Sequence, residues 1–261
     1  MLLVAAQAAR ASASLDVAGE VVSAAPLEVR IVVRNPGVDA TGPLDVIGEL
    51  GTERREARVA GGVPPGGAAS VLLAFDSLPA RPGVHALLLL LEHPVEGTPD
   101  AAGNPPVRSQ RAYVLLALGA RPAPAVRLET DPSSIDVQGT LDVRLRSADG
   151  AAHRMELRAV PARGLRFEGE PVEVSVPADG VVDARLPIVR AGAARGSRNG
   201  VLVVAESPEG PLARTTVAAA AVDVAPDPAW MPRLRLPLLA LGAVLLVLAA
   251  AAEVRARRGR P

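Results

Sequence analysis

The sequence lacks cysteine and lysine entirely and has few aromatic residues. The absence of cysteine excludes disulfides, thiolate metal sites and a cysteine nucleophile. With one Trp and one Tyr, the chain is poor in the aromatic platforms that sugar-stacking clefts and single-stranded nucleic-acid grooves need. Basic and acidic residues balance at 28 each, so no net charge favours nucleic acid as a partner.

No motif in the sequence identifies a reaction. No HExxH pattern, no nucleophile elbow and no phosphate-binding loop with its lysine is present. His85, His93 and His153 do not lie at metal-ligand spacing, so we interpret them as surface or packed residues. A Ser/His/Asp triad is not excluded by residue inventory alone. We therefore predict that the chain is not an enzyme and has neither a bound cofactor nor a small-molecule substrate.

What the sequence does have is an uncharged run near its C-terminus. Leu236–Ala252 holds 17 residues rich in Leu, Val and Ala, which at about 1.5 Å per residue span roughly 25 Å of a bilayer core near 30 Å. We predict a transmembrane helix over 233–253, with a buried helix closing the second domain as the alternative. The residues assigned to the membrane anchor are Trp230, Arg233, Arg235, Leu236, Leu241, Leu248, Arg255, Arg257, Arg258 and Arg260.

The charges that flank this run predict its orientation. Four arginines follow it and two precede it, so the C-terminus is expected in the cytoplasm, with the upstream domains outside the inner membrane. A Pro-rich spacer at 225–232 leads into the span, and Trp230 stands where an interfacial aromatic would. The basic tail, 254–261, is expected to lie on the anionic inner leaflet.

The N-terminal segment resembles the end of a secretory signal peptide. Met1–Ala9 is mostly apolar, and Ala11-Ser12-Ala13 places small residues for cleavage before Ser14. We expect residues 1–13 to be a signal-peptide remnant, since the tail requires export of the upstream part. Because the usual basic leading region is missing, an ordinary N-terminal strand or helix is the alternative.

Residues 14–118 show the alternation of β-strands. Starting at Leu27, every second residue of Leu27–Arg34 is apolar until the turn Asn35-Pro36-Gly37. The five leucines Leu87–Leu91 are too few to span a membrane, and they predict a central strand that is covered on both faces. The other strands expected are Leu44–Leu50, Glu56–Val59, Ala69–Phe75, Val84–Glu92 and Ser109–Leu118.

The same pattern resumes after an Ala/Pro-rich linker at 119–124. Residues 125–224 alternate over several short stretches, as in Leu141–Leu145 and Val172–Val176, and no long amphipathic helix interrupts them. The predicted fold is therefore all-β, with two tandem antiparallel immunoglobulin-like β-sandwiches, 14–118 and 125–224, and one C-terminal transmembrane α-helix.

One loop concentrates oxygen-bearing side chains. Glu92, Glu96, Asp100 and Asn104 fall in one segment after the leucine-rich strand, and Ca²⁺ takes six to eight such oxygen ligands. These four residues are the only metal-site candidates. The alternative, which we favour, is a polar hairpin that solubilises one end of the first sandwich.

The turn residues of the first domain carry a family resemblance. Val33-Arg34-Asn35-Pro36-Gly37, Pro64-Pro65-Gly66-Gly67 and Leu91-Glu92-His93-Pro94 follow in an order that resembles the cell-adhesion-related domain found in bacteria. That immunoglobulin-like family has an Asp at the position of Glu92 and a second Asn at that of Pro105. The resemblance implies a binding or spacer module without catalytic residues. The overall layout is similar to BatD-type aerotolerance proteins in architecture only.

These observations predict a membrane-anchored module of the bacterial envelope that binds or scaffolds another protein. Its expected partners are the lipid bilayer and an envelope protein, with no nucleic acid. The alternatives are a cell-surface adhesion or glycan-binding module that depends on Ca²⁺, and an accessory subunit of an envelope enzyme or transport complex.

Overall fold

The structure, a computed structural model, describes residues 4–5, 15–95 and 105–227. Every regular element in these ranges is a β-strand, which confirms the all-β prediction. The strands lie in one compact unit, Met1–Ala225, and the remaining residues, Pro226–Pro261, form a second unit.

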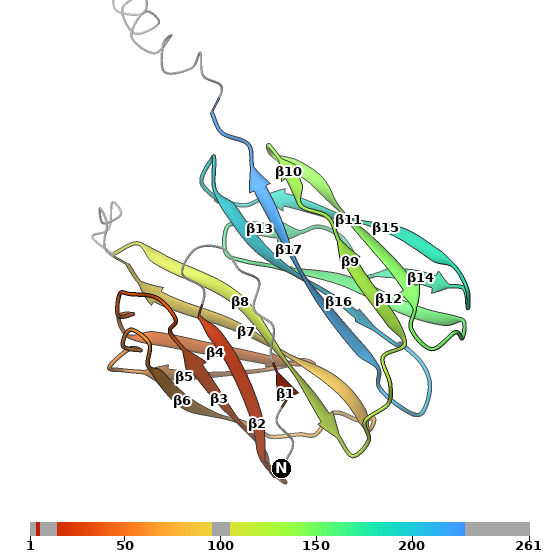
Figure 1. The fold of residues 1–261 in the computed structure, drawn as a ribbon, viewed down its shortest axis with the longest axis horizontal. Helices are drawn as coiled ribbons and strands as arrows, with labels where there is room; N and C mark the ends of the chain where they lie inside the picture. The colour runs from red at the N-terminus through yellow and green to blue at the C-terminus, as the bar shows by residue number, and fades with distance from the viewer. Residues whose placement is uncertain (1–3, 6–14, 96–104, 228–261) are drawn as a thin grey trace, which may run out of the picture. The chain divides into compact units, whose positions relative to one another are not determined.

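Two four-stranded sheets pack face to face in the N-terminal half of the compact unit (Figure 1). Their apolar residues meet in one shared core, which includes Ile31, Phe75 and Leu89. The first sheet has the order β1-β2-β3-β6, with β1 Val4–Ala5, β2 Asp16–Ala24, β3 Leu27–Arg34 and β6 Ala68–Phe75. The second has the order β5-β4-β7-β8, with β5 Glu53–Val59, β4 Leu44–Leu50, β7 Gly83–Pro94 and β8 Val107–Leu118.

The C-terminal half is a second pair of packed sheets with its own core, which includes Leu141, Met155 and Val203. One sheet has the order β13-β15-β11-β9, with β13 Leu165–Phe167, β15 Val181–Arg190, β11 Gln138–Ser147 and β9 Val126–Thr130. The other has the order β10-β17-β16-β12-β14, with β10 Ser133–Ile135, β17 Thr215–Val224, β16 Arg198–Glu206, β12 His153–Pro161 and β14 Val172–Val176. All pairs are antiparallel except β10 with β17, which run parallel.

The leucine-rich run forms the centre of β7, as expected. Leu87, Leu89 and Leu91 point into the first core, because alternate residues of a strand face the same side. Leu88 faces the opposite way and is also buried, in a separate apolar cluster. The prediction that both faces of this strand are covered is thus confirmed.

Some strands carry no clear alternation in the sequence, and β2 shows the reason. Its Gly19 weakens the strand pattern, since glycine has no side chain to pack. In the structure, a Cβ atom at Gly19 would lie only 2.7 Å from the side chain of Val114. The close approach of β8 therefore favours the glycine that hides β2 from pattern reasoning.

The two predicted targeting segments fall largely outside the described residues. Of the N-terminal segment, only Val4–Ala5 is described, and these residues pair with Gly19 and Ala18 of β2 as a short strand. The predicted anchor, from Trp230 to Arg260, lies beyond residue 227. Within the part of the chain that the structure describes, no helix is long and apolar enough to cross a membrane.

The two faces of β7 allow a direct test of the first core. We expect Leu89→Ala to lower the free energy of unfolding of the full chain by about 2–5 kcal/mol, because it removes a fully buried side chain. The matched control is Leu90→Ala, whose side chain is only partly buried and should cost less. Denaturant titration measures both, and equal losses would contradict this assignment of the two faces.

Candidate functional site

The second face of β7 meets the second sandwich at an apolar junction. Ala86 and Leu88 of β7 and Tyr113 of β8 form one cluster with residues of β12, β16 and β17. The residues from the second sandwich are Val160, Leu202, Val204 and Val217. Burial raises the pKa of the Tyr113 phenol above its ordinary value.

Strand β16 mirrors β7 across this junction. Val201, Val203 and Ala205 belong to the core of the second sandwich, whereas Leu202 and Val204 belong to the junction cluster. Full burial of a Leu or Val side chain contributes about 1.5–3 kcal/mol each. The junction is therefore a continuous apolar contact between the two sandwiches.

Backbone contacts reinforce one end of the junction. Gly83 and Ala213 form a parallel β-bridge, in which Val84 N–H donates to the Ala213 carbonyl at 2.8 Å and Ala213 N–H donates to the Pro82 carbonyl at 2.8 Å. Gly83 has φ of 139°, and a Cβ atom there would lie 2.2 Å from the Ala213 carbonyl oxygen. This bridge therefore requires glycine.

Three arginines cross the junction by side-chain contacts. Arg81 donates from Nη2 to the Ser207 carbonyl at 2.8 Å, and Arg111 donates from Nε to the Pro161 carbonyl at 3.0 Å. Arg163 forms an ion pair with Glu92 at 3.6 Å. Burial lowers the pKa of Arg111, although the negative charges of Glu49 and Glu92 act in the opposite direction.

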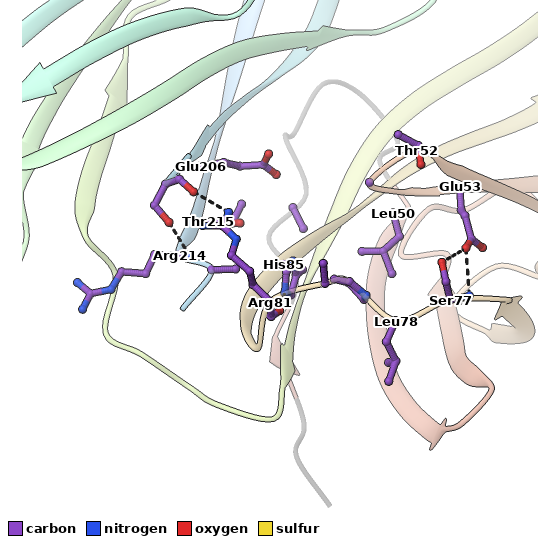
Figure 2. A pocket seen from close by; sticks show the side chains of 16 residues that line it. Leu50, Thr52, Glu53, Ser77, Leu78, Arg81, His85, Glu206, Arg214 and Thr215 are labelled. Atoms are coloured by element: carbon purple, nitrogen blue, oxygen red, sulfur yellow. Dashed lines mark hydrogen bonds between the residues drawn. The ribbon is translucent and has the colours of Figure 1, made fainter. Parts of the chain in front are cut away.

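A cavity of about 300 Å³ lies beside this end of the junction. Figure 2 shows Glu53 and Ser77 on one side, Glu206 and Arg214 on the other, and Arg81 and His85 between them. Its lining thus comes from β5, from the segment that precedes β7, and from the β16–β17 connection.

The polar side chains of this cavity are engaged in local structural bonds. Glu53 accepts hydrogen bonds from the Ser77 hydroxyl, the Ser77 amide (3.0 Å) and the Asp76 amide (3.0 Å). The Ser77 hydroxyl bond, followed by the Asp76 amide bond, lowers the pKa of Glu53. The His85 ring bonds through Nε2 to the Arg81 carbonyl at 2.8 Å. Since Ser77 is bonded to Glu53 and His85 to a backbone carbonyl, these three residues do not have the bonding order of a catalytic triad.

The other two histidines lie elsewhere. His153 bonds through Nε2 to Asp149 at 2.6 Å, and Arg214 contacts the second oxygen of Asp149 at 2.9 Å. The His153 bond is the main cause that lowers the pKa of Asp149 well below its usual range. Burial lowers the pKa of His93. Among the described residues, no group of three or more His, Asp or Glu side chains is placed to hold a metal ion.

The calcium candidates are described only in part. Glu96, Asp100 and Asn104 lie outside the described residues, whereas Glu92 is in β7 and forms the ion pair with Arg163. Glu92 thus contributes to the junction in this structure, and the loop's calcium role stays a prediction.

A second, larger cavity of about 1220 Å³ lies at one end of the first sandwich, and the loop Asn35–Gly42 lines it together with His93 and Arg108. Buried Asn35 holds this loop: its amide donates to the carbonyls of Asp39 (2.7 Å) and Val63 (3.1 Å) and accepts from Gly37 N–H (2.9 Å). Thr41 Oγ1 accepts from Val63 N–H at 2.7 Å. Val38, between these anchors, is 88% exposed.

Sequence reasoning found the turn at Asn35 but missed the junction residues. Arg81, Arg111 and Arg163 look like ordinary surface charges, because nothing in their neighbours indicates a second sandwich. The signal that was available is the burial of both faces of β7 and β16, visible as the runs Leu87–Leu91 and Val201–Ala205.

Comparisons with known proteins place the chain in no family. No family model matches it, and no curated protein matches it. Among solved structures, Salmonella alpha-2-macroglobulin matches with a TM-score of 0.32 and 10% identity, over 84% of this chain and 17% of that one. A protein of unknown function from Porphyromonas gingivalis W83 matches with 0.30 and 16%, over 76% and 91%. A Ca²⁺-stabilised adhesin of an Antarctic bacterium matches with 0.23 and 17%, over 85% and 50%.

This chain therefore spans about a sixth of the macroglobulin's length. All three matched proteins are far below 25% identity and below a TM-score of 0.5. Their activities are not carried over to this chain.

The Gly83–Ala213 bridge gives a test of the junction. We expect Gly83→Ala to destabilise the full chain by about 1–3 kcal/mol more than Gly192→Ala does, because only Gly83 faces the backbone of another segment. Gly192 is a matched control, since its φ of 114° is also positive and no atom lies within 4 Å of its Cβ position. Thermal unfolding measures both variants, and equal losses would show that the bridge contributes nothing beyond backbone strain.

Proposed function

We propose that this chain is a membrane-anchored, extracytoplasmic protein-binding module built from two immunoglobulin-like sandwiches. In this proposal the C-terminal run, 233–253, is a single transmembrane helix, and the sandwiches project outside the inner membrane. The resemblance of the first sandwich to the cell-adhesion-related domain found in bacteria supports a binding role. The proposal assigns no catalytic step to the chain.

The observation that carries the proposal is the Asn35–Gly42 loop. Asn35 and Thr41 fix both ends of this loop by side-chain hydrogen bonds, so its shape does not depend on Val38. A lone exposed apolar residue is ordinary, but here Val38 stands on a fixed loop beside a cavity of about 1220 Å³. Loops held by a rigid scaffold are where binding residues concentrate, and preorganisation reduces the entropy lost on binding.

The composition separates a protein ligand from a glycan. A glycan-binding cleft usually stacks sugars on aromatic rings, and the residues that line this cavity include no Trp, Tyr or Phe. A protein segment needs only apolar contact with Val38 and polar contact with groups such as Arg108 and His93. The protein-binding role is therefore the stronger of the two.

Site-specific photo-crosslinking tests the proposal. With a photoreactive residue at Val38 of the full chain in its native membrane, we expect one discrete cross-linked protein. The matched control is Val181, which is 52% exposed on the second sandwich and should give no such product. Identical products from both positions, or none from either, would contradict the proposal. Retention of the chain on envelope polysaccharide, lost on Val38→Asp, would favour the glycan alternative.

A further inference from the structure

Strand β6 is an unprotected sheet edge. It is the last strand of its sheet and pairs only with β3 (Figure 1). Because the Gly67 carbonyl bonds to Asn35 of the β3 side, while the Ala74 carbonyl is free to accept from the Arg55 side chain at 2.8 Å, the even-numbered residues direct their backbone groups outward. Ser70 and Leu72 therefore offer N–H and C=O groups to a further strand.

The other edge strands in the described part of the chain are short or charged. Native sheets protect their edges with charges, prolines, bulges or very short strands. β5, β8, β9, β13 and β14 all contain charged residues, and β1 and β10 have only 2 and 3 residues. The 8-residue β6, AASVLLAF, has no charge and no proline, and its Leu72 is 48% exposed.

We propose that β6 pairs antiparallel with β6 of a second copy of this chain, with Ser70 of each copy opposite Leu72 of the other. This self-association goes beyond the proposed partner binding and does not depend on it. The pairing continues the sheet across a two-fold axis at Val71 and removes both free edges at once. Each Ser70–Leu72 pair exchanges two backbone hydrogen bonds, and each covers an exposed Leu72.

Charges on the neighbouring strand β3 are complementary in this register. Arg34 lies beside Ala68, and Glu28 lies beside Ala74. When Ser70 opposes Leu72, Ala68 of one copy opposes Ala74 of the other. Each end row on the outer face then reads Arg34, Ala68, Ala74, Glu28, with the opposite charges about 14 Å apart in backbone position. Neither Arg34 nor Glu28 has an ion pair within the described residues, so both are available.

The same strand disfavours the neighbouring registers. Arg30 lies beside Leu72 in the sheet. A shift that places Leu72 opposite Ala68 brings Arg30 into one row with Arg34 of the second copy. The opposite shift, which places Leu72 opposite Leu72, brings the two Arg30 side chains into one row. Like charges in one row disfavour pairing, so only the register proposed here joins opposite charges.

Disulfide cross-linking reads this register directly, because the natural chain has no cysteine. Full-length chains carrying Ser70→Cys are mixed with chains carrying Leu72→Cys and oxidised. We expect several-fold more cross-linked dimer from the mixture than from either variant alone, since only opposed residues lie within disulfide distance. The control mixture is Val137→Cys with Val181→Cys, which are 53% and 52% exposed on the second sandwich. If the first mixture cross-links no more than this control, the proposal is wrong.

A charge exchange in the same assay tests the complementarity. Arg34→Glu should reduce the cross-linked yield, and adding Glu28→Arg on the same chain should restore it. Arg121→Glu, in the segment between the sandwiches, is the control for net charge and should leave the yield unchanged. Circular dichroism melts check that every variant is folded. A double variant that stays as weak as Arg34→Glu would refute the proposed pairing, while leaving binding at Val38 untouched.

Discussion

The structure depends on one apolar contact, the packing of the outer face of β7 and β8 on the outer face of β16 and β17. Leu88, Leu202 and Val204 are almost fully buried there, although each belongs to a strand whose other face already fills a sandwich core. This two-sided burial gives β7 and β16 a continuous apolar sequence in place of alternation. The hydrophobic effect thus joins two sandwiches that a short Ala/Pro-rich segment alone would leave independent.

Around this contact, polar groups settle the geometry rather than carry out chemistry. The bridge between Gly83 and Ala213 and the bonds from Arg81 and Arg111 give direction to an interface that apolar packing leaves undirected. Glu53, Ser77 and His85 are engaged in the same local framework. Surfaces that remain available for binding therefore lie away from the junction, at the Val38 loop and at the β6 edge, on one compact unit.

Much of this architecture can be read from the sequence, and the remainder has a physical reason. Leu44–Leu50 is predicted to the residue, and the run Leu87–Leu91 correctly indicates a strand covered on both faces. Such a run cannot say what covers the second face, because a helix and a second sheet bury leucine equally well. Strand β2 is hidden by Gly19, and Glu92 was taken for an ion ligand because its partner Arg163 is 71 positions away, counted as 163 minus 92. Long-range pairing of this kind leaves no trace in local pattern.

The central claim, that the junction holds the two sandwiches in one fixed arrangement, is tested most directly by a distance between them. Spin labels on cysteines placed at Val22 and Val181, exposed positions on the first and second sandwich, are measured by pulsed dipolar spectroscopy on the full chain. The account predicts a single narrow distance distribution that broadens when Leu88→Asp places a charge in the apolar contact. A broad distribution with the natural Leu88 would contradict it.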